Sequence, residues 1–168
     1  MGLPSDPLAA LRVLDTEFGS GLTFFQTWHA RKADPTHSRS LHYVALCTTP
    51  CHVEDLHQHA LTAPELSPLA HQLAVFWHGL LPGFHRFLLD HGQVSLTLCV
   101  GEPISMLRAQ QFEPDTVALA AGQLDTSNLL WLSKAVARCC RRGTALIVRD
   151  APQTGMGDIR GALVQSGF

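Results

Sequence analysis

The sequence predicts a single three-layer α/β domain, spanning residues 1–168, with a largely parallel sheet. Three observations predict it. Short apolar runs alternate along the chain with longer helical segments. Two glycines, Gly19 and Gly21, follow the first apolar run at the place where a strand turns into a helix. With 168 residues, of which 46% are hydrophobic, the chain is long enough to bury one sizeable core.

The first third of the sequence predicts a strand, a helix and a second strand. Residues 11–14 form a short apolar run, and residues 22–33 carry apolar side chains at helical spacing. Asp34-Pro35 ends this helix, and residues 41–46 are apolar and rich in strand-forming residues. Such a unit is almost always right-handed, and its two strands are parallel.

The middle of the sequence predicts two helices and a hairpin. The helical segments lie between residues 53 and 78 and are divided at Ala63-Pro64, because proline suits the first turn of a helix. Residues 84–89 and 93–100 then form two strand-like runs joined by Asp90-His91-Gly92, which is typical of a hairpin. A short helix is expected over residues 104–109.

The last third returns to alternating elements. We expect a strand over residues 116–121, a helix over 127–142, a strand over 144–148 and a helix over 156–165. Gly143 follows two arginines, a pattern that is typical of a helix C-terminus.

Composition narrows the classes of function. The formal net charge of −2 does not favour nucleic-acid binding over the whole surface, so a polyanion would need a local patch, for which residues 138–149 are the candidate. We find neither a signal peptide nor an apolar run of membrane-spanning length, and we expect a cytoplasmic protein without membrane contact. The five cysteines form an odd set without framework spacing, which favours a reducing compartment.

The candidate site lies where the predicted strands end, because open α/β sheets bind ligands at the carboxyl ends of their strands. Glycines such as Gly19 and Gly21 permit positive φ angles and close ligand approach, although many such turns have glycines for packing alone. Glu102 could accept a hydrogen bond from a cofactor or stabilise the start of the next helix. A zinc site among Cys47, Cys51 and the nearby histidines lacks ligand spacing, and we expect no metal.

Three segments are similar to one family. Residues 15–28, D-T-E-F-G-S-G-L-T-F-F-Q-T-W, are similar to its E-x-G-F-G-T-G-L-N-F-L-x-x-W. Residues 64–101 contain the specific L-P-G-F-H-R segment and the hairpin that follows it. Residues 157–168 match its G-x-I-R-x-x-L-x-x-x-G-F. Along most of its length the chain therefore resembles the methyltransferase domain of the MnmC family, which completes 5-methylaminomethyl-2-thiouridine at the tRNA wobble position.

The resemblance implies a class I, Rossmann-like methyltransferase fold that binds S-adenosylmethionine (SAM) over the strand ends. It implies a glycine loop at Glu17, Gly19 and Gly21, with a ribose-binding acid at the position of Cys47 and an adenine-side acid at Glu102. With the acid that opens the loop, the implied cofactor-binding residues are Asp15, Glu17, Gly19, Gly21, Cys47 and Glu102. Compared with the family, we expect the chain to begin at the first strand, to end before the usual final hairpin and to lack the oxidoreductase half.

Several positions depart from the family pattern. Glu17 replaces a loop glycine, and Cys47 cannot offer the two carboxylate acceptors that would bind a ribose diol. Ala120 replaces the acid that would orient or deprotonate the substrate amine, so Asp125, the one acid left in this loop, is the candidate substitute. These departures leave the methyltransferase activity itself open.

Three functions remain open from the sequence. The first is a SAM-dependent tRNA methyltransferase-like domain, whose family reaction is N-methylation of 5-aminomethyl-2-thiouridine, with tRNA as its partner. The second is a non-catalytic interaction module that forms a homodimer through an exposed sheet edge. The third is a methyltransferase that acts on another substrate, which the altered segment 120–131 would also permit.

Overall fold

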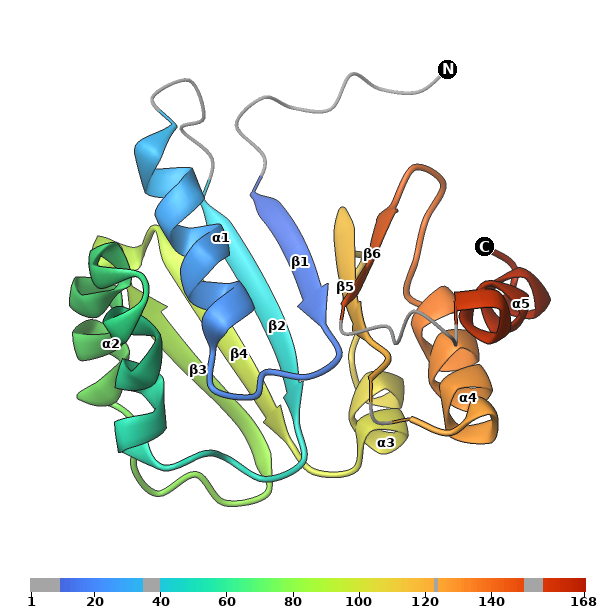
Figure 1. The fold of residues 1–168 in the computed structure, drawn as a ribbon, viewed down its shortest axis with the longest axis horizontal. Coiled ribbons are helices and arrows are strands. Elements are labelled where there is room, and N and C mark those ends of the chain that lie inside the picture. Colours follow the sequence, from blue (N-terminus) through green and yellow to red (C-terminus); the bar gives the residue numbers. More distant parts are fainter. Residues whose placement is uncertain (1–9, 35–39, 123, 150–155) are drawn as a thin grey trace.

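The computed structural model describes residues 10–34, 40–122, 124–149 and 156–168. In these residues one sheet contains six strands in the order β3-β4-β2-β1-β5-β6 (Figure 1). The strands are β1 Leu11–Asp15, β2 Leu41–Cys47, β3 Gly83–Leu89, β4 Val94–Val100, β5 Thr116–Ala120 and β6 Ala145–Arg149. The helices are α1 Leu22–Ala33, α2 Ser67–Ala74, α3 Pro103–Arg108, α4 Thr126–Ala137 and α5 Met156–Ser166, with 3-10 segments η1 Val53–Leu61, η2 Pro64–Leu66 and η3 Asp90–Gly92.

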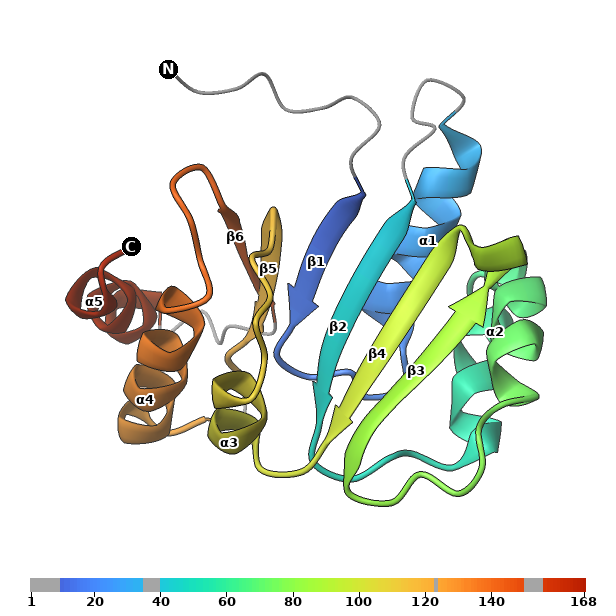
Figure 2. The same ribbon diagram turned by 180° about the vertical axis from the view of Figure 1, so that it is seen from behind.

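Helices cover both faces of the sheet, and the predicted three-layer α/β fold is confirmed. Helices α1 and α2 pack on one face, whereas α3, α4 and α5 lie on the other (Figures 1 and 2). Each interface has its own apolar core: Phe24, Trp28 and Leu96 belong to the first, and Leu14, Leu119 and Val136 to the second. This arrangement, in a mostly parallel sheet, is that of a Rossmann-like methyltransferase fold.

The strand pairing agrees with the predicted units. β1 is parallel to β2, with Leu11 opposite Leu41, and both are joined through α1. β3 and β4 form the predicted antiparallel hairpin, whose turn places Asp90 and His91 at positive φ. β1 also pairs with β5, so the chain leaves β1 toward β2 and later returns to its other side. The point where the strand order reverses is therefore between β1 and β5.

Three predicted helices differ from the observed ones. Residues 53–61 form a 3-10 segment instead of an α-helix, and Leu56 is its one buried side chain. Helix α2 ends at Ala74 instead of continuing to residue 78, since Phe76 N already bonds Leu73 O in the tighter i→i−3 pattern. Helix α4 ends at Ala137, where the backbone also changes to i→i−3 hydrogen bonds.

In the residues that the structure describes, no helix is long and apolar enough to span a bilayer.

Candidate cofactor site

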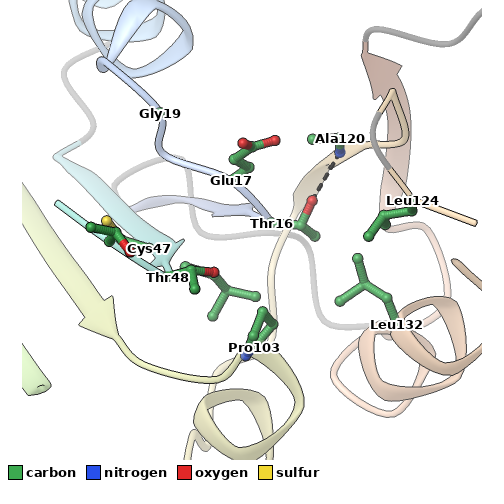
Figure 3. Close-up of a pocket in the computed structure, with 11 residues that line it drawn as sticks. Thr16, Glu17, Gly19, Cys47, Thr48, Pro103, Ala120, Leu124 and Leu132 are labelled. Atoms are coloured by element: carbon green, nitrogen blue, oxygen red, sulfur yellow. Dashed lines mark hydrogen bonds between the residues drawn. The ribbon is translucent and has the colours of Figure 1, made fainter. Parts of the chain in front are cut away.

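A pocket of about 350 Å³ lies at the carboxyl ends of β1, β2 and β5 (Figure 3). It opens beside the point where the strand order reverses, which is the usual ligand position in open α/β sheets. The lining residues come from the last residues of these strands, from the loops that follow them, from the start of α3 and from the middle of α4: Thr16, Glu17, Gly19, Leu46, Cys47, Thr48, Thr49, Pro103, Ala120, Leu124 and Leu132. We call this the strand-end pocket.

The two loop glycines have different roles. Gly19 has a φ of 58° and lines the pocket, and a Cβ atom added there would have no heavy atom within 4 Å. Gly21 has a φ of 88°, and an added Cβ would come within 2.9 Å of the Phe25 ring and 3.0 Å of the Phe18 ring. The loop therefore needs Gly21 for packing, while Gly19 leaves open space for a close approach to the backbone.

Asp15 lies beneath the loop and does not line the pocket. Its carboxylate is fully buried, accepts a hydrogen bond from the Tyr43 hydroxyl at 2.6 Å and another from the Glu17 backbone N–H at 3.0 Å. Arg149 forms an ion pair with the same carboxylate. Burial nevertheless raises the pKa of Asp15 to about 6, because the loss of hydration outweighs the stabilisation by Arg149 and Tyr43. Asp15 thus holds the loop in position, and a direct role in cofactor binding stays a prediction.

The contact of Arg149 with Asp15 and the glycine loop was not predicted from the sequence. Arg149 stands at the end of β6, and its guanidinium also donates hydrogen bonds to the Thr23 hydroxyl and, at 2.8 Å, to the Glu17 carbonyl. One side chain therefore connects the edge strand to the glycine loop and to α1. Arg149 lies 134 residues from Asp15 in sequence, so no local pattern could have revealed the pair.

Glu17 and Cys47 both line the pocket, as the strand-end argument predicts. Glu17 is exposed and is the one charged side chain among the described lining residues. The Cys47 thiol is buried, and burial, together with Cys51 and Glu17 nearby, raises its pKa to about 11. It is therefore a neutral group at physiological pH. The exposed side chains of Thr48 and Thr49 beside it supply hydroxyl donors and acceptors that the sequence pattern did not indicate.

Glu102 caps helix α3. Its carboxylate accepts hydrogen bonds from Ile104 N at 3.0 Å, Ser105 N at 2.7 Å and the Ser105 hydroxyl at 2.6 Å. These bonds lower the pKa of Glu102. The structure thus shows the helix-start role that the sequence allowed, and a second role toward a cofactor stays a prediction.

The loop after β5 brings Ala120, but not Asp125, to the pocket. Ala120 is buried, and its N–H donates to the Thr16 hydroxyl at 2.8 Å, which fixes the ends of β1 and β5 side by side (Figure 3). Asp125 is exposed and caps α4 by accepting from Asn128 N at 2.8 Å. Between them Leu124 contributes an apolar wall. The Asp125 carboxylate is thus bound to the start of α4 and is not part of the pocket lining. A catalytic role for Asp125 stays a prediction.

The cysteines and histidines around η1 form other contacts. The His59 ring nitrogen Nε2 lies 2.6 Å from the Ser20 hydroxyl, and the His57 ring packs edge-on against His71. Throughout the described part of the chain, no group of three potential metal-ligating side chains comes together.

Comparison with known proteins relates nearly the whole chain to one set of bifunctional proteins. No family model matches the chain. The "tRNA 5-methylaminomethyl-2-thiouridine biosynthesis bifunctional protein MnmC" of Polaromonas naphthalenivorans is 47% identical over 93% of this chain. The proteins of the same name from Verminephrobacter eiseniae and Paraburkholderia phytofirmans are 41% and 36% identical over 99% and 93% of the chain. The chain spans 24–28% of the length of these relatives. The resemblance seen in the sequence is confirmed, and the chain is a homologue of one segment of the MnmC proteins.

Proposed function

We propose that this chain binds SAM in the strand-end pocket and acts as the methyltransferase-like domain of a tRNA-modifying protein. The family reaction that we assign to it is N-methylation of 5-aminomethyl-2-thiouridine at the wobble position. The observation that carries the proposal is the pocket beside the left-handed Gly19, at the point of strand-order reversal, in a chain whose relatives are named for tRNA 5-methylaminomethyl-2-thiouridine biosynthesis.

The lining residues fit such a cofactor in three respects. Open space at Gly19 permits backbone contact with a ligand. The Glu17 carboxylate complements the positive charges of the sulfonium and amino groups of SAM. Thr48 and Thr49 offer hydroxyl partners for a ribose in place of the carboxylate that Cys47 lacks. When bound, SAM supplies an electrophilic methyl group.

The chain's own contribution to methyl transfer would be positioning. Ala120 provides no base at the position where the family has an acid, and the neighbouring side chains of Leu124 and Leu132 are apolar. Holding a neutral amine in line with a methyl donor and excluding water can account for most of the rate enhancement in such a displacement. We therefore assign the role of the pocket to orientation, with Leu124 and Leu132 excluding water.

Restoring the family acid tests this assignment. Cys47→Asp is expected to bind SAM about 10-fold to 100-fold more tightly than the natural chain, because a charged hydrogen bond contributes roughly 1.5 to 3 kcal/mol. Cys47→Asn, which has similar volume and no charge, is the matched control and should gain much less. Calorimetric titration with SAM measures both variants. Equal affinities for Asp, Asn and Cys at residue 47 would argue against a ribose position in this pocket.

An interaction module is the second candidate. Strand β6 forms one edge of the sheet, and Ile147 on it is 56% exposed. Exposed apolar edge strands are templates for pairing with another chain. Sedimentation that reveals a concentration-dependent dimer, in a protein that does not bind SAM, would favour this function over the first.

A further inference from the structure

In the residues that the structure describes, the second face of β3 has no helix over it, and α3 covers only part of that face of β2 and β4 (Figure 2). Seen from behind, β2, β4 and β3 lie in front with α1 and α2 beyond them, whereas α4 and α5 lie toward β5 and β6 (Figure 2). Helix α3 contacts β2 and β4, in the core that contains Val44, Leu46 and Cys99. Besides the buried Leu14, Val44, Leu46 and Cys99, the strand register brings seven residues to this face, of which Ser95 is also buried: Arg12, His42, Ser95, Thr97, Phe84, Arg86 and Leu88. We call these seven residues the open face.

The open face gathers cationic side chains. His42 lies between Arg12 and Arg86 in the strand order, and its pKa is lowered by partial burial and by the positive charges of Arg86 and Arg12. Arg12 and His42 are register partners on β1 and β2, and Arg86 lies two strands farther along the sheet, on β3. Arg86 is exposed, and its Nε donates to the Ser95 hydroxyl at 3.2 Å, which holds the guanidinium over the sheet.

Exposed apolar side chains lie on the same face. Phe84 is 49% exposed and Leu88 61% exposed, on either side of Arg86 along β3. Proteins usually keep such side chains covered when they alternate along an edge strand. An exposed aromatic ring beside cationic and hydroxyl groups on a sheet is an arrangement on which nucleic-acid bases stack.

The cationic surface continues past Arg12. The Arg12 guanidinium lies 5.7 Å from the centre of the Phe112 ring, and a hollow of about 480 Å³ there is also lined by Arg138. Glu113 is the one acid among the described residues that line this hollow. The positive groups thus outnumber the negative one, although the whole chain carries a formal net charge of −2.

We propose that the open face binds a single-stranded segment of RNA, with its phosphates on Arg12 and Arg86 and a base stacked on Phe84. This inference rests on the proposed function, because it identifies the surface that would hold the tRNA substrate. The chain as a whole is nearly neutral, but the arginines make this patch locally positive. Such a patch attracts a polyanion. A sheet that presents an exposed aromatic ring can stack unpaired bases, which an anticodon loop presents.

The test is fluorescence anisotropy with a labelled, unmodified anticodon stem-loop RNA, titrated with the full chain at several salt concentrations. The double variant Arg12→Gln with Arg86→Gln is expected to weaken binding at least tenfold. It should also reduce the slope of log affinity against log salt by about 1.4, because each phosphate that an arginine neutralises on a single strand accounts for about 0.7. Arg142→Gln with Arg160→Gln removes the same charge from exposed positions off the open face and should retain most of the affinity.

A second variant tests stacking. Phe84→Ala should weaken RNA binding by about tenfold at every salt concentration, because stacking on a ring does not depend on counterions. Val164→Ala, on an exposed apolar residue of α5, is its control and should bind as the natural chain does.

Each other outcome has a definite meaning. Equal losses in the two arginine pairs, or no RNA binding by the natural chain, would overturn the open face as an RNA site. A dimer in sedimentation that only the Arg12 and Arg86 variant abolishes would also overturn it and would reassign the face to a protein partner. SAM titration of the same proteins decides the proposed function separately, because none of the substituted residues lines the strand-end pocket.

Discussion

Arg149→Met is expected to lower the free energy of unfolding by about 3 kcal/mol at pH 7, because it leaves a buried carboxylate without its cation. Asp15 is fully buried, and Arg149 is its one cationic hydrogen-bond partner among the described residues. The substitution also removes the bonds from Arg149 to Thr23 and to the Glu17 carbonyl, so the glycine loop loses its connection to β6. Chemical denaturation of the natural and variant chains measures the difference.

The loss should depend on pH in a specific direction. The pKa of Asp15 is about 6 in the folded chain and 3.8 unperturbed, so in the natural chain this group reduces stability as pH rises from about 4 to 6. Arg149 lowers that pKa, and without it the folded pKa moves above 6, which extends the loss of stability to higher pH. The gap between the natural chain and the variant should therefore be smaller at pH 5, where only the bonds to Thr23 and the Glu17 carbonyl are lost, and larger at pH 7.5. The exposed Arg142→Met serves as control, and a gap independent of pH would contradict the assigned ion pair.

Gly21→Ala should destabilise the fold by about 3 kcal/mol and abolish SAM binding at the concentrations that saturate the natural chain. The positive φ of Gly21 costs an L-residue roughly 1 to 2 kcal/mol. The added Cβ would also press on the buried rings of Phe18 and Phe25, and such overpacking typically costs about 1 to 3 kcal/mol. The loop would have to shift, and the strand-end pocket would shift with it.

The control for Gly21 is another left-handed glycine. Gly143 has a φ of 93°, and an added Cβ there would have no heavy atom within 4 Å. Gly143→Ala should therefore show the backbone cost alone, about 1 kcal/mol, with unchanged SAM binding. Thermal unfolding of both variants separates the two contributions. Equal destabilisation of the two would mean that Phe18 and Phe25 do not restrict the loop.

The sequence was sufficient to locate the pocket. Alternating strands and helices predicted the layers. The rule that ligands bind at strand ends selected four residues that line the strand-end pocket: Glu17, Gly19, Cys47 and Ala120. It also selected Asp15, Gly21 and Glu102, which are not among the lining residues. The unit of β1, α1 and β2 and the hairpin of β3 and β4 were predicted because their signals are local: a glycine turn in one and a short polar turn in the other.

The sequence could not predict contacts between distant residues. Arg149 reaches Asp15 across 134 positions, and the Thr16 hydroxyl accepts from Ala120 N across 104. Neither pair has a local signature. Helix ends were overestimated for a related reason: apolar spacing continues past Ala74, while the backbone there already forms i→i−3 bonds. From the sequence, the Glu102 carboxylate could have bound either a cofactor or the N–H groups at the start of the next helix. The structure shows that the N–H groups of Ile104 and Ser105 donate to it.

The most direct test of SAM binding is a calorimetric titration of the full chain with SAM, repeated with S-adenosylhomocysteine. We expect saturable one-to-one binding of SAM in the micromolar range. We also expect weaker binding of S-adenosylhomocysteine, because that product lacks the sulfonium charge that Glu17 complements. A folded chain that releases no heat at millimolar concentrations of either ligand would contradict SAM binding in the strand-end pocket.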